Sequence, residues 1–220
     1  MTQPEAGRGP LGLFGGTFDP IHYGHLRLAE TARETLGLET VRLIPAGQPP
    51  HRAAPGASGT DRLAMARLAA ADNPAFEVDA AEVESAAASY TILTLERIRA
   101  ELGPTRPLVL LLGLDAFLGL PSWHRWEALF DFAHLAVANR PGYTLAPDVA
   151  PAALAPLLAA RQASPAALAD APSGRIVSFG MTPLTISATD LRSRAATGQS
   201  LRYLLPPAVL DYISQRQLYV

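Results

Sequence analysis

The sequence predicts an α/β fold with a doubly wound, mostly parallel sheet and helices on both faces, in a single domain. Short apolar runs alternate along the chain with longer segments of helical periodicity, which is the pattern of successive βαβ units. One run, residues 108–112, is five aliphatic residues in a row, as is typical of a parallel strand covered on both faces. The length of 220 residues and the hydrophobic fraction of 49% suit one domain with a full core.

Each expected strand is a short apolar run that stops at a turn-forming residue. The first, residues 11–14, stops at Gly15 and Gly16, and the second, residues 41–44, stops at Pro45. The six expected strands are residues 11–14, 41–44, 76–79, 108–112, 133–138 and 176–179.

Helical periodicity and capping residues mark the expected helices between these strands. Gly37 is placed as the C-cap of the first helix, and Thr60 and Ser89 as N-caps of the next two. The expected helices are residues 25–36, 61–71, 90–102 and 188–196, with a last one that Pro206 and Pro207 open and that runs toward Gln217.

Two segments fit neither pattern. Residues 45–59 contain four Pro and three Gly and predict a long loop, which in a compact domain is usually functional or mobile. Residues 144–174 are rich in Ala and Pro and predict a surface insertion with helical pieces. In a doubly wound sheet, ligands bind beyond the carboxyl ends of the strands at the switch point, so the residues after each strand are the candidate site.

The composition restricts the classes of function. Lys and Arg number 18 against 20 Asp and Glu, and a net charge of −2 argues against a nucleic-acid binder that works by bulk charge. The absence of cysteine excludes a disulfide scaffold, a thiolate metal site and a Cys nucleophile. No apolar run reaches the roughly 20 residues that span a bilayer, and residues 1–10 lack the apolar core of a signal peptide. We therefore expect a cytoplasmic protein with no membrane or nucleic-acid partner, a flexible tail at 1–10 and one domain at 11–220.

The strongest candidate site is the string GGTFDPIHYGH, residues 15–25, directly after the first strand. Gly15 and Gly16 let the backbone approach a ligand closely, and His22 and His25 lie at i and i+3 where a helix begins. Backbone N–H groups at a helix N-terminus favour an anion. Two imidazoles beside that anion suit the stabilisation of charge on a phosphoryl group during transfer.

The second candidate is ISATDLR, residues 186–192. Ser187 and Asp190 have the spacing of a capping box, and Arg192 follows within the first turns of the helix. Free N–H groups, hydroxyls and a guanidinium together form a phosphate-binding arrangement. Taken alone, this segment is more typical of an ordinary capped helix, and its pairing with the first string favours the phosphate site.

Both strings resemble signatures of the bacterial nicotinate-nucleotide adenylyltransferases, G-G-x-F-D-P-x-H-x-G-H and I-S-x-T-x-x-R, within the nucleotidylyltransferase superfamily. The resemblance extends from about Leu11 into the last helix and implies a Rossmann-like fold. It implies transfer of the adenylyl group of ATP to nicotinate mononucleotide, giving deamido-NAD and pyrophosphate, with His22 and His25 as the catalytic residues. The implied ATP-binding residues are Gly15, Gly16, Thr17, Phe18, His22, His25, Ser187, Thr189 and Arg192, with His51 and Arg52 of a segment similar to P-x-H-K/R.

Further segments resemble the acceptor site of the same family. The implied nicotinate mononucleotide-binding residues are Thr91, Asp115, Trp123, His124 and Arg140. By this resemblance Thr91 receives the nicotinate carboxylate and Trp123 stacks on the pyridine ring, although Trp123 taken alone is more typical of a core. Arg140 matches the second Arg of an R-R-P-G element that grips the mononucleotide phosphate, and Asn139 stands in place of the first.

The implied reaction needs no protein nucleophile, because the acceptor phosphate is already ionised and the protein mainly positions the groups. Mg²⁺ is expected to be held mainly by the ATP phosphates and water, since no acidic cluster or H-E-x-x-H motif indicates a protein-built metal site. Three alternatives remain: pantetheine phosphate as acceptor, nicotinamide mononucleotide as acceptor, and a nucleotide-binding protein without turnover. His22 argues against the first, because pantetheine-phosphate adenylyltransferases usually have Thr there, and the intact His22, His25 and Arg192 argue against the last.

Overall fold

The centre of the molecule is one parallel six-stranded sheet. The computed structural model describes residues 9–48, 55–139, 145–182 and 184–220. The strands lie in the order β3-β2-β1-β4-β5-β6, and each neighbouring pair is parallel. The strands are β1 (Leu11–Gly16), β2 (Thr40–Pro45), β3 (Phe76–Val78), β4 (Leu108–Gly113), β5 (His134–Asn139) and β6 (Ile176–Gly180). The doubly wound prediction is confirmed, since the strand order changes direction between β1 and β4.

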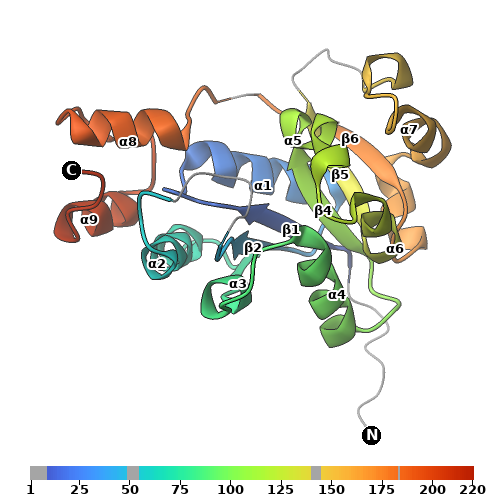
Figure 1. Ribbon diagram of the computed structural model, residues 1–220, viewed down its shortest axis with the longest axis horizontal. Coiled ribbons are helices and arrows are strands. Elements are labelled where there is room, and N and C mark those ends of the chain that lie inside the picture. Colours follow the sequence, from blue (N-terminus) through green and yellow to red (C-terminus); the bar gives the residue numbers. More distant parts are fainter. Residues whose placement is uncertain (1–8, 49–54, 140–144, 183) are drawn as a thin grey trace, which may run out of the picture.

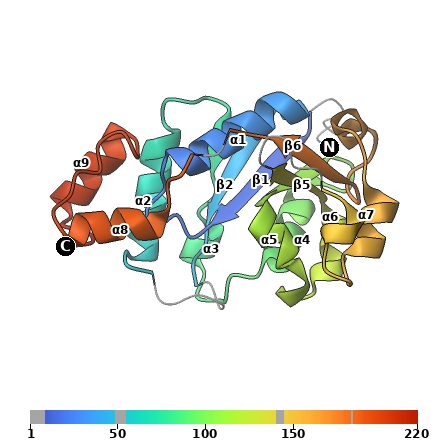
Figure 2. The same cartoon turned by 90° about the horizontal axis from the view of Figure 1, so that it is seen from above.

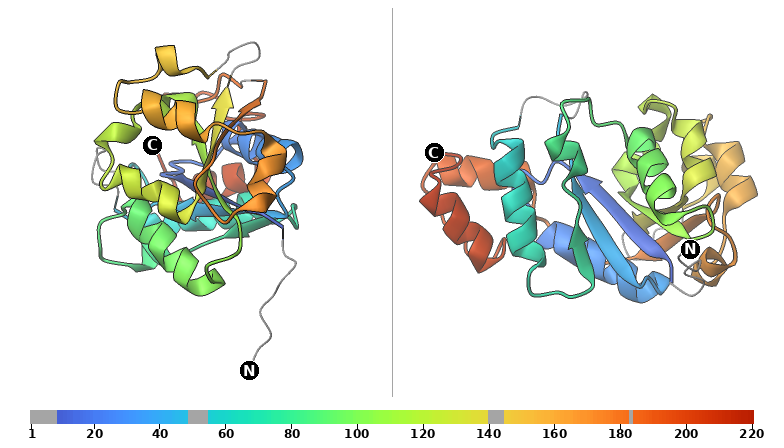
Figure 3. Two further views of the ribbon diagram at one scale, coloured as in Figure 1. Left: turned by 90° about the vertical axis from the view of Figure 1, so that its right-hand side faces the viewer. Right: turned by 90° about the horizontal axis from the view of Figure 1, so that it is seen from below.

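Helices cover both faces of this sheet (Figure 1, Figure 2). The α-helices are α1 (Tyr23–Leu36), α2 (Gly59–Ala70), α3 (Ala81–Glu84), α4 (Thr91–Leu102), α5 (Leu114–Leu118), α6 (Leu129–Phe132), α7 (Ala155–Arg161), α8 (Ala188–Ala196) and α9 (Pro207–Gln215). Short 3₁₀ turns lie at Leu120–Ser122, Trp126–Ala128, Pro147–Val149 and Pro165–Asp170. Figure 3 shows α2, α8 and α9 grouped at one end of the molecule. Among the described residues, no helix is long and apolar enough to cross a membrane.

The sheet separates two hydrophobic cores, and β4 shows why its sequence is uniformly aliphatic. Val109 and Leu111 join the core formed with α1, α2, α8 and α9, whereas Leu108, Leu110 and Leu112 join the core formed with α4 to α7. Successive residues of a strand point to opposite faces, so a strand buried on both faces needs apolar side chains throughout.

The expected N-cap of α2 is wrong by two residues. The helix begins at Gly59 rather than Asp61, and Ser58 is its N-cap: Ser58 Oγ accepts a hydrogen bond from the N–H of Asp61 at 3.1 Å. Thr60 lies inside the first turn. Because both Ser and Thr are good caps, the choice between them depends on where the preceding loop enters the helix, which the local sequence does not determine.

The Ala- and Pro-rich segment from residue 144 contains α7 and two 3₁₀ turns. Four of its leucines are buried: Leu145, Leu154 and Leu158 lie in the core with α4 to α7, and Leu168 lies in the other core. Hydrophobic burial therefore anchors this segment to the sheet. Residues 1–8 of the expected tail lie outside the described residues.

Candidate active site

A cavity of about 230 Å³ opens at the carboxyl ends of β1 and β4, where the strand order changes direction. Gly15, Gly16 and Thr17 line one side of it, and Thr91 and Trp123 also line it. The structure therefore brings together residues that the sequence analysis assigned to ATP and to the acceptor. This is the position at which doubly wound sheets bind their ligands.

Five residues after Thr17, His22 and His25 form the N-terminal cap of α1. The N–H of Gly24 donates to Nδ1 of His22 at 3.1 Å, and the N–H of His22 donates to Nδ1 of His25 at 3.3 Å. The two rings stack with their centroids 3.8 Å apart and their planes 26° apart. A neutral imidazole that accepts at Nδ1 carries its proton on Nε2. Both rings are thus held in the form that donates from Nε2, which suits contact with phosphate oxygens.

Burial keeps His22 neutral, and ring packing fixes His25 in place. The His22 side chain is 5% exposed, and desolvation lowers its pKa to about 4, so it is uncharged near neutral pH. Phe18 packs edge-on against the His25 ring with centroids 5.1 Å apart, and it is 2% exposed. The Phe18 side chain therefore belongs to the core, and any contact of Phe18 with ATP would come from its backbone.

We expect His22 to make the protein sensitive to acid. Its pKa is lowered from 6.5 to about 4 in the folded state. As the pH falls from 6.5 toward 4, the unfolded chain takes up a proton at His22 and the folded chain does not, so stability falls across this window. The full effect is about 3 kcal/mol.

The variant His22→Asn keeps an N-cap acceptor and removes the titrating group. Urea unfolding at pH 7 and pH 4.5 should show a smaller loss of stability for this variant than for the wild type. His134 is also buried with a lowered pKa, and it contributes equally to both proteins. An equal loss of stability in the two proteins would contradict the assignment.

The helix α8 begins beside the histidine turn. Ser187 is its N-cap, as the capping-box spacing predicts, and its Oγ accepts the N–H of Asp190 at 3.1 Å. Arg192 donates from Nη1 to the backbone oxygen of Asp19 at 2.8 Å, and its Nη2 lies 3.5 Å from Thr189 Oγ1. The two candidate phosphate strings, far apart in the sequence, therefore meet in space.

Close approach of these strings depends on the glycine between the two histidines. A Cβ on Gly24 would lie 3.0 Å from the His22 ring and 3.6 Å from the backbone oxygen of Ile186. A larger residue there would push against the His22 ring. The glycine of the HYGH sequence thus lets α1 begin directly against the segment that leads into α8.

Ser89 does not cap α4 as expected. The helix begins at Thr91, and Ser89 Oγ instead accepts the backbone N–H groups of Gly47 and Gln48 at 2.9 and 3.1 Å. Ser89 thereby ties the chain after β2 to the start of α4. The reason is tertiary: two unpaired N–H groups after a strand outcompete a helix end that is close by in sequence.

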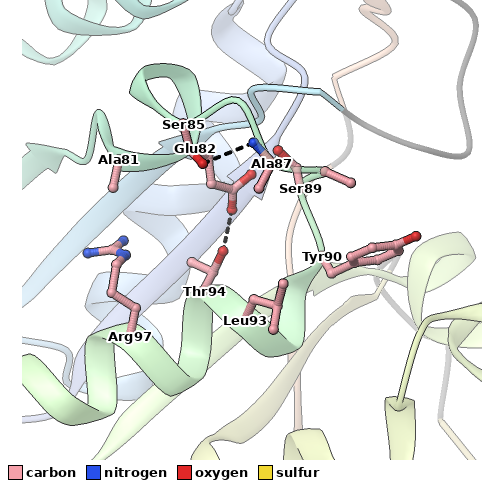
Figure 4. Close-up of a pocket in the computed structure, with 10 residues that line it drawn as sticks. Ala81, Glu82, Ser85, Ala87, Ser89, Tyr90, Leu93, Thr94 and Arg97 are labelled. Atoms are coloured by element: carbon pink, nitrogen blue, oxygen red, sulfur yellow. Dashed lines mark hydrogen bonds between the residues drawn. The ribbon is translucent and has the colours of Figure 1, made fainter.

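A second, smaller hollow of about 130 Å³ lies against the same segment (Figure 4). Glu82 stands between the two hollows and lines both of them, and its Oε1 accepts a hydrogen bond from Thr94 Oγ1 at 2.5 Å. Ser89 and Thr94 also line both hollows. These three side chains therefore lie between the two hollows.

A buried arginine that belongs to neither candidate string holds the backbone beside the cavity. Arg62 is 1% exposed and donates to the backbone oxygens of Thr17 at 2.8 Å, Ala46 at 2.5 Å and Gly47 at 3.0 Å. Its Nε also donates to the backbone oxygen of Ala57 at 3.4 Å. Arg62 therefore joins the chain after β1 to the chain after β2.

Several expected site residues lie elsewhere. Of the described candidate residues, the cavity lining contains Gly15, Gly16, Thr17, Thr91 and Trp123. It does not contain Phe18, His22, His25, Ser187, Thr189 or Arg192, nor Asp115 and His124, which are both exposed. The His124 ring packs against Tyr90, with centroids 4.6 Å apart, beside Thr91. His51, Arg52 and Arg140 lie outside the residues that the structure describes.

The described part of the chain offers no group of three or more His, Asp or Glu side chains that could hold a metal ion. Asp19, the acidic residue of the first string, has its carboxylate engaged by the N–H groups of Gly56 and Ala57 and by the Tyr219 hydroxyl. The carboxylate oxygens of Asp19 are thus already paired with donors of the protein.

Known proteins match the chain over most of its length. Residues 13–194 match the family model described as cytidylyltransferase-like. A "Probable nicotinate-nucleotide adenylyltransferase" of Dechloromonas aromatica (strain RCB) is 54% identical over 211 residues, which are 96% of this chain and 97% of the relative. A protein of the same name from Aeromonas hydrophila is 53% identical over 211 residues, with the same coverage of each chain.

Solved structures share the fold. The structure of Plasmodium falciparum nicotinic acid mononucleotide adenylyltransferase complexed with NaAD superposes with a TM-score of 0.71 at 16% sequence identity. The superposition covers 96% of this chain and 98% of that chain. At this identity the likeness supports the architecture described above.

Proposed function

Since this chain belongs to the nicotinate-nucleotide adenylyltransferases, within the cytidylyltransferase-like family, we propose that it transfers the adenylyl group of ATP to nicotinate mononucleotide. The products are deamido-NAD and pyrophosphate, and the enzyme is a nucleotidyltransferase of NAD biosynthesis. The observation that carries this proposal is that Gly15, Gly16 and Thr17 share one cavity at the switch point with Thr91 and Trp123, close to the stacked rings of His22 and His25. The cytoplasmic location expected from the sequence belongs to the same proposal.

In the proposed reaction the phosphate oxygen of the acceptor attacks the α-phosphorus of ATP in line. A new P–O bond forms while the bond to pyrophosphate breaks, and the electron pair leaves with pyrophosphate. His22 and His25 donate from Nε2 to oxygens of the phosphoryl group in transfer, where negative charge redistributes. Because burial keeps His22 neutral, it contributes a fixed hydrogen-bond donor rather than a mobile charge.

The remaining phosphate contacts are assigned to the two ends of the site. Ser187, Thr189 and Arg192 hold ATP phosphates at the start of α8, where the helix N-terminus favours an anion. His51 and Arg52, outside the described residues, are proposed to assist there. Magnesium held by the ATP phosphates and water would neutralise part of the phosphate charge.

The acceptor is assigned to the side of the cavity formed by Thr91 and Trp123. Stacking of the pyridine ring on the indole of Trp123 gains from burial and from the contact of two aromatic faces. We assign Asp115, Arg140 and the backbone of His124 to the acceptor as well. Asn139, at the end of β5, is buried, and its Oδ1 has no hydrogen-bond partner among the described residues.

Pyrophosphate release from ATP, measured with each acceptor in turn, tests the function. Nicotinate mononucleotide should give a kcat/KM about 10²-fold above that of nicotinamide mononucleotide. Backbone N–H donors that fit a carboxylate are left facing an NH₂ group when the amide binds, and unpaired buried donors are costly. The preference should persist in His124→Ala, because that ring lies against Tyr90 rather than in the cavity lining.

The other outcomes of this assay identify the alternatives. Equal efficiencies with the two mononucleotides would overturn the nicotinate assignment, and turnover with pantetheine phosphate alone would change the acceptor class. Absence of turnover with every acceptor, with ATP still bound, would indicate a nucleotide-binding protein that does not catalyse.

A further inference from the structure

Asp19 lies in the turn between the two glycines and the two histidines, and its buried carboxylate joins distant parts of the chain. The residue is 4% exposed. Its Oδ2 accepts the N–H of Gly56 at 2.7 Å, and its Oδ1 accepts the N–H of Ala57 at 3.0 Å. Oδ1 also accepts the hydroxyl of Tyr219, which is 200 residues away in sequence, at 2.8 Å.

Arg192 closes this group on the side of α8. Its Nη1 donates to the backbone oxygen of Asp19 at 2.8 Å and lies 3.5 Å from Oδ2 of the same residue. Gly56 packs tightly between the other two side chains, because a Cβ on it would lie 3.1 Å from Cδ of Arg192 and 3.2 Å from the Tyr219 ring. We call Asp19, Gly56, Arg192 and Tyr219 the Asp19 cluster.

The Tyr219 hydroxyl keeps its proton in this cluster and donates it in a hydrogen bond to Asp19. Its burial and the adjacent Asp19 carboxylate both raise the pKa of the Tyr219 hydroxyl, so it stays protonated at neutral pH. The residue follows α9 and has a positive φ of 67°, a conformation that side chains rarely adopt. A hydrogen bond to a buried carboxylate is among the stronger ones, because few water molecules can reach the carboxylate and donate in place of the hydroxyl.

The position of Asp19 decides what this bond can influence. Asp19 is three residues before His22, and its backbone oxygen is the acceptor for Arg192. A shift of Asp19 therefore displaces the histidine turn and the guanidinium together. Small displacements of groups that bind a reacting phosphate have large effects on rate.

We propose that Tyr219 is a positioning residue for adenylyl transfer: its hydroxyl fixes Asp19, and through Asp19 it aligns the His22 turn with Arg192 at the ATP phosphates. This inference rests on the proposed function, since it assigns those two elements to ATP. It makes the segment after α9 part of the active site, although Tyr219 itself is not assigned a contact with substrate.

The chain offers a matched control for this proposal. The Tyr212 hydroxyl donates to Oδ1 of Asp61 at 2.9 Å, so it forms a similar bond from the same C-terminal region. That bond ends at the first turn of α2 rather than at the histidine turn. Loss of either hydroxyl should therefore lower stability by a similar amount, and only the loss at Tyr219 should reach the ATP site.

The test compares Tyr219→Phe with Tyr212→Phe in the full chain. We expect Tyr219→Phe to lower kcat/KM for ATP about tenfold or more, with KM for nicotinate mononucleotide within about twofold of wild type. Tyr212→Phe should keep both values near those of wild type, at a similar melting temperature. Asp19→Asn should show the same ATP defect, and adding Tyr219→Phe to it should cause little further loss, since the pair acts as a unit.

Calorimetric titration with a non-hydrolysable ATP analogue separates this proposal from the proposed function. Weaker binding of about tenfold in Tyr219→Phe alone supports the positioning role even if no acceptor is turned over. Wild-type binding and kcat in Tyr219→Phe would overturn it, and so would equal defects in both Tyr variants. A Tyr219→Phe protein that fails to fold while Asp19→Asn folds with normal ATP kinetics would also overturn it.

Discussion

Replacing His25 by alanine should lower kcat by about 10²–10³-fold and change KM for ATP much less. The Nε2–H of this ring is oriented by the backbone bond to its Nδ1, so it needs little reorganisation when charge develops on the phosphoryl group. An interaction that is stronger in the transition state than in the ground state appears mainly in kcat. Steady-state pyrophosphate release over a range of ATP concentrations gives both constants.

The structure adds a control, because His25 also has a structural role. Its Nδ1 accepts the N–H of His22 as the reciprocal half of a capping box. Glutamine at the same helical position can accept that bond in the usual way. His25→Gln should therefore keep most of the thermal stability and still show the loss in kcat. Near-normal kcat in His25→Gln would mean that the residue matters for capping and not for catalysis.

Much of the fold can be predicted from the sequence because each strand is a separate apolar run. The uniformly aliphatic β4 (Leu108–Gly113) predicts burial on both faces, and its side chains do divide between the two cores. Gly37 predicts the end of α1, where its φ of 65° and its N–H bond to the Arg33 carbonyl oxygen form the C-cap. Local chemistry is enough for such features, since the responsible residues are neighbours in sequence.

The features that could not be predicted depend on distant partners. Ser89 has the right position to cap α4, yet it binds backbone groups after β2, and nothing near Ser89 in sequence indicates that alternative. The bond between Asp19 and Tyr219 spans 200 residues. Sequence motifs indicate Gly15 and Trp123 as candidate site residues, but only the fold shows that they share one cavity.

Arg62 is the clearest case of a residue whose importance only the structure reveals, and its replacement should have the largest effect on stability. In sequence it resembles Arg67, five residues later in α2 (Gly59–Ala70), which is exposed. The two arginines differ only in which face of the helix they occupy. Arg62 points inward, and its guanidinium donates to backbone oxygens of the segments that follow β1 and β2. These carbonyl groups lie beyond the ends of the strands, so the side chain supplies the donors that a neighbouring strand would otherwise give.

Arg62→Met should lower the free energy of unfolding by about 3–5 kcal/mol, because an apolar side chain leaves several buried carbonyl oxygens without donors. Arg62→Lys should recover only part of this, since an ammonium cannot reproduce the planar fork that reaches separate oxygens. Arg67→Met, the matched control on the exposed face, should change stability by less than about 0.5 kcal/mol. Urea unfolding of the three variants measures these differences, and KM for ATP should rise in Arg62→Lys because Thr17 loses its anchor. Similar small losses of unfolding free energy at positions 62 and 67 would show that the four hydrogen bonds from Arg62 to carbonyl oxygens contribute little. Packing in the two hydrophobic cores would then be what maintains the shape of the cavity.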